Sequence, residues 1–118
     1  MANEMIKVAG KDVQLRPFEG MARWAGTRIV EIFDTSGKTR MGCGIHEIFK
    51  SETTEPDRTV DDILYILEGE VEIRFGDRSE TFRSGDFAYL SAGITVTYVV
   101  PERVKLMYVV YPANWKSA

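Results

Sequence analysis

A run of alternating apolar residues, interrupted by glycines, extends from Asp62 to Gly93 and constrains the fold more than any other part of the chain. In DDILYILEGEVEIRFG, apolar side chains recur at every second position: Leu64, Ile66, Val71, Ile73 and Phe75. This period of two predicts half-buried strands, with a hairpin turn at Glu68-Gly69. Downstream, GDFAYLSAG places a short apolar strand between turns at Ser84-Gly85-Asp86 and Ala92-Gly93.

The rest of the chain also favours strands, because no segment has a long helical period. We expect an irregular segment over residues 1–24, a turn at Asp34-Thr35-Ser36-Gly37, and a polar loop from Lys50 to Asp61. The expected strands are Ala25 to Phe33, Met41 to Phe49, the hairpin Asp62 to Phe75, Ser79 to Phe82, Phe87 to Leu90, Ile94 to Val100 and Val104 to Tyr111. About eight short strands predict an all-β jelly-roll β-barrel over residues 25–115, in a single domain that spans residues 1–118.

Composition and charge exclude several classes of function. The net charge of -3 gives little attraction for nucleic acid or an anionic membrane. The N-terminus has no apolar core typical of a signal peptide, and no apolar run approaches the roughly 20 residues that span a bilayer, so we expect a cytoplasmic protein. Cys43 is the single cysteine, which rules out an internal disulfide and a cysteine-cluster zinc site within one chain.

The glycine spacing resembles the two sequence motifs of the cupin superfamily. Asp62 and Gly69 match the end of the first motif, whose acidic residue binds metal, and Gly85 and Gly93 match the second. The three histidine ligands of those motifs are absent. Val96 occupies the last histidine position, and EPDR at residues 55–58 stands where the paired histidines should fall.

Within the superfamily, the chain resembles the EutQ family of ethanolamine-utilization proteins. Three segments carry this resemblance: GCGIHEIF at residues 42–49, VDDILYILEGEVEI at residues 60–73 and LMYVVYPANW at residues 106–115. Such proteins also lack the usual cupin histidines. The resemblance therefore implies a cupin jelly roll without the three-histidine metal site, and a place in ethanolamine utilization.

Five acidic residues could converge at the mouth of such a barrel: Glu47, Glu55, Asp57, Asp61 and Asp62. Carboxylates bind hard divalent cations such as magnesium, calcium or manganese, but a loop of solvated acids has the same sequence pattern. The cofactor is therefore left open, with Asp62 as the candidate metal ligand. If Asp62 is buried among carboxylates, its ionised form is disfavoured, which would suit a general acid or base.

Other candidate ligand-binding residues are a histidine and two tyrosines. His46 is the only histidine and can titrate near neutral pH, although a packed or surface role is the commoner one. Tyr98 shares the face of Val96 if strand alternation holds, so it is the best pocket tyrosine, and Tyr89 is the second. Most of the other aromatic residues are expected in the core or at an interface.

Two functions remain open on the sequence. In the first, the barrel binds a small polar metabolite and the chain is an enzyme of small-molecule catabolism. Asp62 or Glu47 would be the acid or base, and Tyr98 would donate a hydrogen bond. Isomerisation, elimination and acyl-phosphate chemistry all suit these residues. In the second, the chain is a non-catalytic binding or assembly protein. Strands that are apolar on both faces, such as ITVTYVV, predict a homodimer in either case.

Overall fold

The computed structural model describes residues 5–33 and 39–115, and within them the protein is all-β. The strands are β1 (Arg16–Pro17), β2 (Arg28–Phe33), β3 (Gly42–Glu55), β4 (Asp61–Phe75), β5 (Arg78–Arg83), β6 (Phe87–Leu90) and β7 (Val96–Tyr111), with 3-10 turns η1 (Gly10–Asp12) and η2 (Ala22–Trp24). All strand pairs are antiparallel. They form one sheet in the order β1-β2-β3-β7-β4-β5, with β6 paired to β4.

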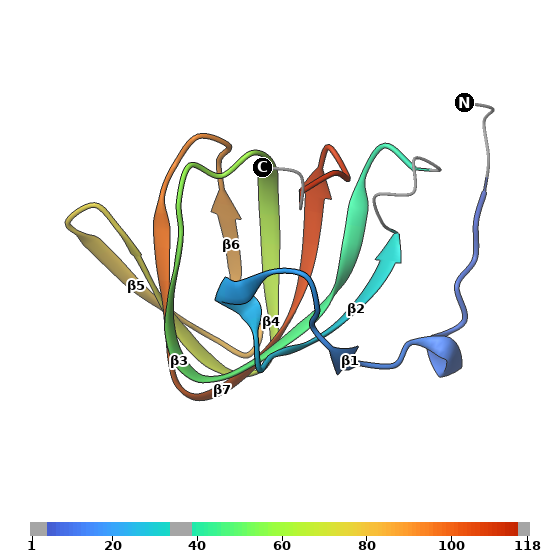
Figure 1. Cartoon of the computed structure of the whole chain (residues 1–118), viewed down its shortest axis with the longest axis horizontal. Helices are drawn as coiled ribbons and strands as arrows, with labels where there is room; N and C mark the ends of the chain where they lie inside the picture. The colour runs from blue at the N-terminus through green and yellow to red at the C-terminus, as the bar shows by residue number, and fades with distance from the viewer. Residues whose placement is uncertain (1–4, 34–38, 116–118) are drawn as a thin grey trace.

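The sheet curves around its inner face, and the long strands β3, β4 and β7 make most of the curve (Figure 1). β7 pairs with β3 on one side and with β4 on the other. The first half of β4 pairs with β6 and its second half with β5. η2 lies across the open side of the curve (Figure 1). The segment between β3 and β4, residues 56–60, borders the space on the inner face of the sheet.

The predicted hairpin at Glu68-Gly69 is wrong, because β4 runs through both residues without reversing. Gly69 has a φ of +78°, and a Cβ at this position would collide with the carbonyl oxygen of Arg103 on β7. The register between β4 and β7 shifts on both sides of Glu68-Gly69. This glycine therefore marks an irregular, bent stretch of a long strand and lets two backbones approach closely.

Two further boundaries differ from the prediction. β3 continues to Glu55, because Ser51 to Glu55 pair in register with Val100 to Val96. The polar loop is therefore shorter than expected and begins after Glu55. β7 runs unbroken from Val96 to Tyr111, where two strands were expected. Pro101 is accommodated because two residues of β7 oppose the single residue Lys50 of β3, which forms a bulge that spares the missing N–H.

Other predicted elements are close to the observed ones. β6 has the predicted bounds, β5 is one residue longer at each end, and β2 begins at Arg28. Residues 16–17 and the two 3-10 turns give the N-terminal segment more order than expected. The turn predicted at Asp34-Thr35-Ser36-Gly37 lies outside the described residues. In the part of the chain that the structure describes, no helix is long and apolar enough to cross a membrane.

The hydrophobic core lies on the inner face of the sheet. Ile48, Ile66, Val71, Val96, Val100 and Val104 are its most deeply buried side chains. Along β7 buried and half-buried residues alternate, as expected for a strand with one face toward the core. At the end of the core that lies near η2, polar side chains replace the aliphatic ones.

Candidate functional site

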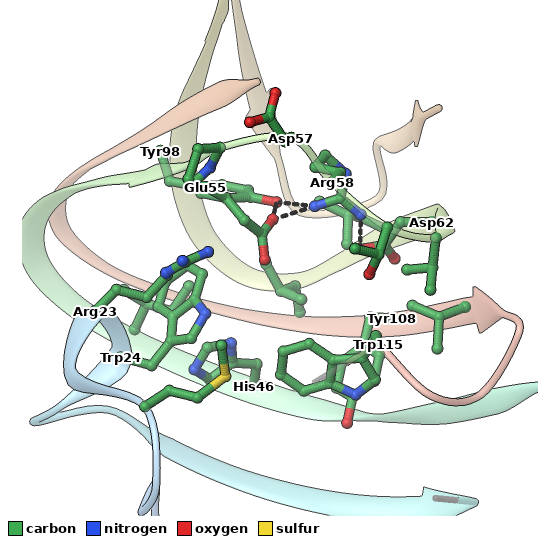
Figure 2. A pocket seen from close by; sticks show the side chains of 18 residues that line it. Arg23, Trp24, His46, Glu55, Asp57, Arg58, Asp62, Tyr98, Tyr108 and Trp115 are labelled. Atoms are coloured by element: carbon green, nitrogen blue, oxygen red, sulfur yellow. Dashed lines mark hydrogen bonds and ion pairs between the residues drawn. The ribbon is translucent and has the colours of Figure 1, made fainter. Parts of the chain in front are cut away.

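A cavity of about 60 Å³, partly open to solvent, lies on the inner face of the sheet, between β3, β4, β7, η2 and the β3–β4 segment. A water molecule needs roughly 10–15 Å³ by this measure, so the space suits a molecule of about four non-hydrogen atoms. Figure 2 shows the polar side chains on one side of this space and the aromatic rings on the other. The cavity is therefore small, and its two sides differ in chemistry.

Arg58 is the centre of the polar side. Its Nη2 donates a hydrogen bond to Asp62 Oδ2 at 2.8 Å, and its Nη1 donates to Glu55 Oε1 and to the Tyr98 hydroxyl. The Tyr98 hydroxyl in turn donates to Glu55 Oε1 at 2.9 Å. Arg58 is 6% exposed, so this is a buried network in which one guanidinium holds two carboxylates and a phenol.

The backbone around Arg58 is fixed by the turn between β6 and β7. The Arg58 N–H donates to the Ile94 carbonyl at 2.9 Å, and the Gly93 N–H donates to the Arg58 carbonyl at 2.6 Å. Asp57 precedes Arg58 with a φ of +44°, and its N–H donates to Thr95 Oγ1. These bonds turn the chain so that Arg58 points inward while Asp57 stays exposed at the rim of the cavity.

Asp62 is the most perturbed acid of the site. Burial raises the pKa of its carboxyl to about 7, although Arg58 opposes the rise. Only Oδ2 is held by Arg58, and Oδ1 is buried without a hydrogen-bond partner in the described part of the chain. A carboxyl that is about half ionised at neutral pH and has one unoccupied oxygen is suited to exchange a proton with a ligand.

The aromatic side is built on η2 and β3. The Trp24 ring packs against His46 and Tyr98, with ring centroids 4.8 Å and 5.5 Å apart. Thr27 Oγ1 donates to the Trp24 carbonyl and lies 2.8 Å from His46 Nε2, so His46 donates to Thr27 through Nε2–H. Burial lowers the pKa of His46 to about 3, which keeps this histidine neutral. His46 thus orients η2 and lines the cavity without adding charge.

The residues of the cavity do not fit a divalent metal. Among the described residues, no three histidine, cysteine or acidic side chains are grouped closely enough to hold one. Asp62 gives one oxygen to the Arg58 guanidinium, and Val96, at the last histidine position, is a buried aliphatic side chain. The Arg58 guanidinium therefore lies beside the acid that could have been a metal ligand.

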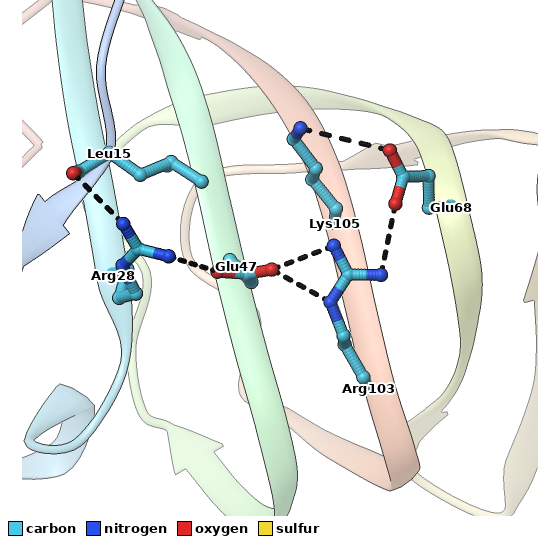
Figure 3. A network of polar contacts seen from close by, with 6 residues as sticks. All are labelled: Leu15, Arg28, Glu47, Glu68, Arg103 and Lys105. Atoms are coloured by element: carbon cyan, nitrogen blue, oxygen red, sulfur yellow. Dashed lines mark hydrogen bonds and ion pairs between the residues drawn. The ribbon is translucent and has the colours of Figure 1, made fainter.

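Glu47 lies outside the cavity, on the outer face of the sheet. It accepts hydrogen bonds from Arg28 on β2 and Arg103 on β7, at 3.3 Å and 2.7 Å (Figure 3). Arg103 also bonds Glu68, which pairs with Lys105. Glu47 is buried by these arginines, so the structure places it in a charge network between strands and not beside Asp62.

The other predicted residues divide between the cavity and its surroundings. Glu55, Asp57, Asp62, His46 and Tyr98 line the cavity, so the structure brings these five together. Asp61 is directed elsewhere, because its Oδ1 accepts a hydrogen bond from the Ala92 N–H at 2.9 Å and holds the β6–β7 turn. Tyr89 is 62% exposed on β6, away from the cavity.

Sequence reasoning missed the role of Arg58. Arg58 was part of the EPDR segment but was given no role of its own. A single basic residue among several acids that are expected in a barrel mouth is a usable signal, because buried carboxylates need a cation. The sequence did not distinguish Trp24 from the other aromatic residues that could line a pocket, because its place depends on how η2 packs over the sheet.

Comparison with protein families shows which family this chain belongs to. The model of the family described as "Ethanolamine utilisation protein EutQ" matches residues 5–117. The chain belongs to the EutQ family. A curated EutQ-family relative from Clostridioides difficile, named acetate kinase EutQ, is 30% identical over 87 residues, which are 74% of this chain and 55% of the relative. Another with that name, from Salmonella typhimurium, is 33% identical over 57 residues, 48% of this chain and 25% of the relative. The chain thus spans between a quarter and about half of these relatives.

Solved structures confirm the cupin fold of this EutQ-family chain. The Clostridium difficile EutQ protein superposes with a TM-score of 0.71 at 26% identity, over 77% of this chain and 66% of that protein. An ethanolamine utilization protein Q from Salmonella typhimurium gives a TM-score of 0.76 at 22% identity, over 90% and 85% of the two chains. The cupin domain of Schizosaccharomyces pombe Cnp3 gives 0.68 at 14% identity, over 91% and 69%.

Proposed function

We propose that this EutQ-family chain binds a small polar metabolite in the Arg58 cavity and that Asp62 exchanges a proton with it. The observation that carries the proposal is the Asp62 carboxyl, which is fixed by Arg58 through one oxygen and leaves the other unpartnered in a cavity. The pKa of about 7 means that Asp62 is both acid and base near neutral pH. Tyr98 keeps its proton, because burial raises its pKa, and its hydroxyl supports Glu55.

Acyl-phosphate chemistry is the reaction class that the name of the curated relatives, acetate kinase, favours for this site. In such a reaction a carboxylate oxygen of acetate bonds to the γ-phosphorus of a nucleoside triphosphate, the bond from that phosphorus to the bridging oxygen breaks, and the nucleoside diphosphate leaves. Acetate is small enough for the cavity, and a protonated Asp62 could donate a hydrogen bond to it. Because the chain spans about half or less of these relatives, the activity of the whole relative is a proposal here.

The test is formation of acetyl phosphate from acetate and ATP, trapped as the hydroxamate. We expect Asp62→Asn to lower the rate by about 100-fold, the low end of the range for losing a general acid or base. The matched control is Glu80→Gln, because Glu80 is an exposed acid of β5 that pairs with Arg78 far from the cavity. Equal rates for the two variants would contradict a catalytic role for Asp62.

A non-catalytic binding or assembly role is the second candidate, and the outer face of the sheet favours it. Strand register places apolar residues side by side on this face: Phe87 beside Tyr65, Tyr65 beside Met107, Met107 beside Ile45 and Ile45 beside Val30. The Tyr65 and Phe87 rings are in contact, with centroids 4.6 Å apart, and Phe87 is 68% exposed. An apolar face of this kind is typical of an interface.

We propose that this face pairs two copies of the chain, as the sequence predicted, in a cytoplasmic homodimer. Light scattering of the purified chain at micromolar concentration should give twice the mass of 13.4 kDa. Phe87→Ser should shift the protein toward the monomer, while Asp12→Asn, at an exposed residue of the 3-10 turn η1, should not. A monomeric wild-type chain would contradict the homodimer.

A further inference from the structure

An extended arm, residues 5–9, precedes β1 and exposes its apolar side chains. Met5, Ile6 and Val8 are all exposed, and the Met5 side chain is 99% exposed. Within the described part of the chain, residues 5–8 make no backbone hydrogen bond and pair with no strand. Figure 1 shows the arm beyond β2, on the opposite side of the molecule from β5 and β6. Large apolar side chains gathered on one exposed segment indicate a surface that a partner covers.

A groove of about 410 Å³ lies at the opposite edge of the sheet from β1, between β5 and β6. Large apolar side chains line it: Phe75 of β4, Phe82 of β5, Phe87 and Tyr89 of β6, and Ile94 in the β6–β7 turn. Among the described residues, β5 and β6 each pair only with β4, so each strand has one free backbone edge. An apolar groove beside free strand edges suits an extended apolar segment, which can pair with an edge and fill the groove with its side chains.

The apolar row on the outer face indicates how two copies would bring the arm and the groove together. The row runs from Phe87 on β6 to Val30 on β2, and Met107 on β7 is its middle residue. A homodimer interface is self-complementary about a twofold axis. An axis through Met107 and parallel to the strands would place Val30 of one copy over Phe87 of the other. Because β1 pairs with Arg28 and Ile29, next to Val30, the arm of one copy would begin beside the groove of the other.

We propose that residues 5–9 of each copy lie in the groove between β5 and β6 of its partner in the homodimer. Alternate side chains of an extended segment share a face, so Ile6 and Val8 enter the groove and Lys7 faces solvent. The chain between Ile6 and β1 can span about 30 Å, whereas packed sheets lie about 10 Å apart, so the arm is long enough to cross between copies. The inference rests on the homodimer proposed above and adds the segment that fills its groove.

Cross-linking between two different chains tests where the arm lies. Both variants are made in a Cys43→Ser background, which removes the only cysteine. Lys7→Cys marks the solvent side of the arm, and Ser91→Cys marks the exposed rim of the groove. One variant carries an affinity tag, so that a product of the two different chains has its own mass. We expect this product when the mixed variants are treated with a short bismaleimide.

Glu19→Cys is the matched control for Ser91→Cys. Glu19 is also exposed, but it lies between β1 and η2, at the other edge of the sheet from the groove. Mixed with Lys7→Cys, it should give little product. Equal yields from the two mixtures would overturn the placement of the arm. A product that forms only between two Ser91→Cys chains would overturn it as well, because it would show that the two grooves face each other.

The dissociation constant of the homodimer, measured by light scattering over a dilution series, tests the side chains of the arm. Ile6→Ser should raise this constant about 100-fold, because burying one such side chain is worth about tenfold and the dimer contains the change twice. Lys7→Ser, on the other face of the same arm, is the matched control and should raise it less than about threefold. Circular dichroism verifies that each variant is folded.

The wild-type chain separates failure of this inference from failure of the homodimer. If the wild-type chain is a monomer at micromolar concentration, both the homodimer and the arm exchange are overturned. If it is a dimer whose dissociation constant changes no more in Ile6→Ser than in Lys7→Ser, the arm exchange is overturned and the homodimer stands.

Discussion

The buried acid Asp62 makes the stability of this protein depend on pH in an unusual direction. Its pKa is about 7 in the folded chain and near the ordinary value of 3.8 in the unfolded one. Between these values the folded state binds a proton that the unfolded state has released, so the free energy of unfolding falls as pH rises. The difference is about three pH units, and at about 1.4 kcal/mol per unit it amounts to about 4 kcal/mol.

Asp62→Asn removes this titration and keeps an oxygen that can accept from Arg58. We therefore compare the free energies of unfolding of the wild-type chain and the variant, measured by urea titration and tryptophan fluorescence at four pH values from 4.5 to 7.5. The wild-type chain should lose about 3 kcal/mol relative to Asp62→Asn over this range, because the rest of the loss falls below pH 4.5.

Groups that are shared by both proteins cancel in this comparison. Glu68 and Glu72 have pKa values lowered chiefly by hydrogen bonds, so they stabilise the folded chain as pH rises, but they do so in both proteins. Glu80→Gln should follow the wild-type curve within about 0.5 kcal/mol. A wild-type-minus-variant difference that stays constant between pH 4.5 and 7.5 would refute the buried, proton-binding state of Asp62.

Three further predictions concern Gly69, Arg58 and Glu47. Gly69→Ala should lower the free energy of unfolding by about 3 kcal/mol or more, because the added Cβ collides with backbone atoms at a residue whose φ is positive. Gly76→Ala is the control: its φ is also positive but the space around it is open, so it should cost about 1 kcal/mol. Urea titration compares the two variants. Arg58→Met should cost about 3–5 kcal/mol at pH 8 because it leaves buried carboxylates unpaired, and the exposed Arg78→Met should cost less than about 0.5 kcal/mol; similar losses would contradict the buried network. Glu47→Gln should lower stability and leave the dissociation constant of the cavity ligand unchanged, as calorimetry can verify, because its partners lie on the outer face.

Part of the candidate site could be predicted from local pattern. The period of two along a strand puts Tyr98 on the same face as Val96, and the buried positions of β7 confirm that alternation. The cupin motif placed Asp62 inside the barrel, and it is buried there. The same alternation separated His46 from Glu47, so the two neighbours had to lie on opposite faces. Which of these faces was the inner one was not encoded locally.

The sequence by itself determined the class of fold and most of the strands, because alternation, turn residues and glycine spacing are local properties of the chain. The tertiary structure decided where long strands bend and which charges meet. From the sequence alone, Gly69 fits a hairpin turn as well as an irregular, bent strand. The close approach of Arg103 on β7 shows that it lies in a bent strand. Arg58 became the centre of the site because the turn at Gly93 holds its backbone and two acids converge on its side chain. Such contacts join residues that are far apart in the chain, and they exist only once the sheet has closed.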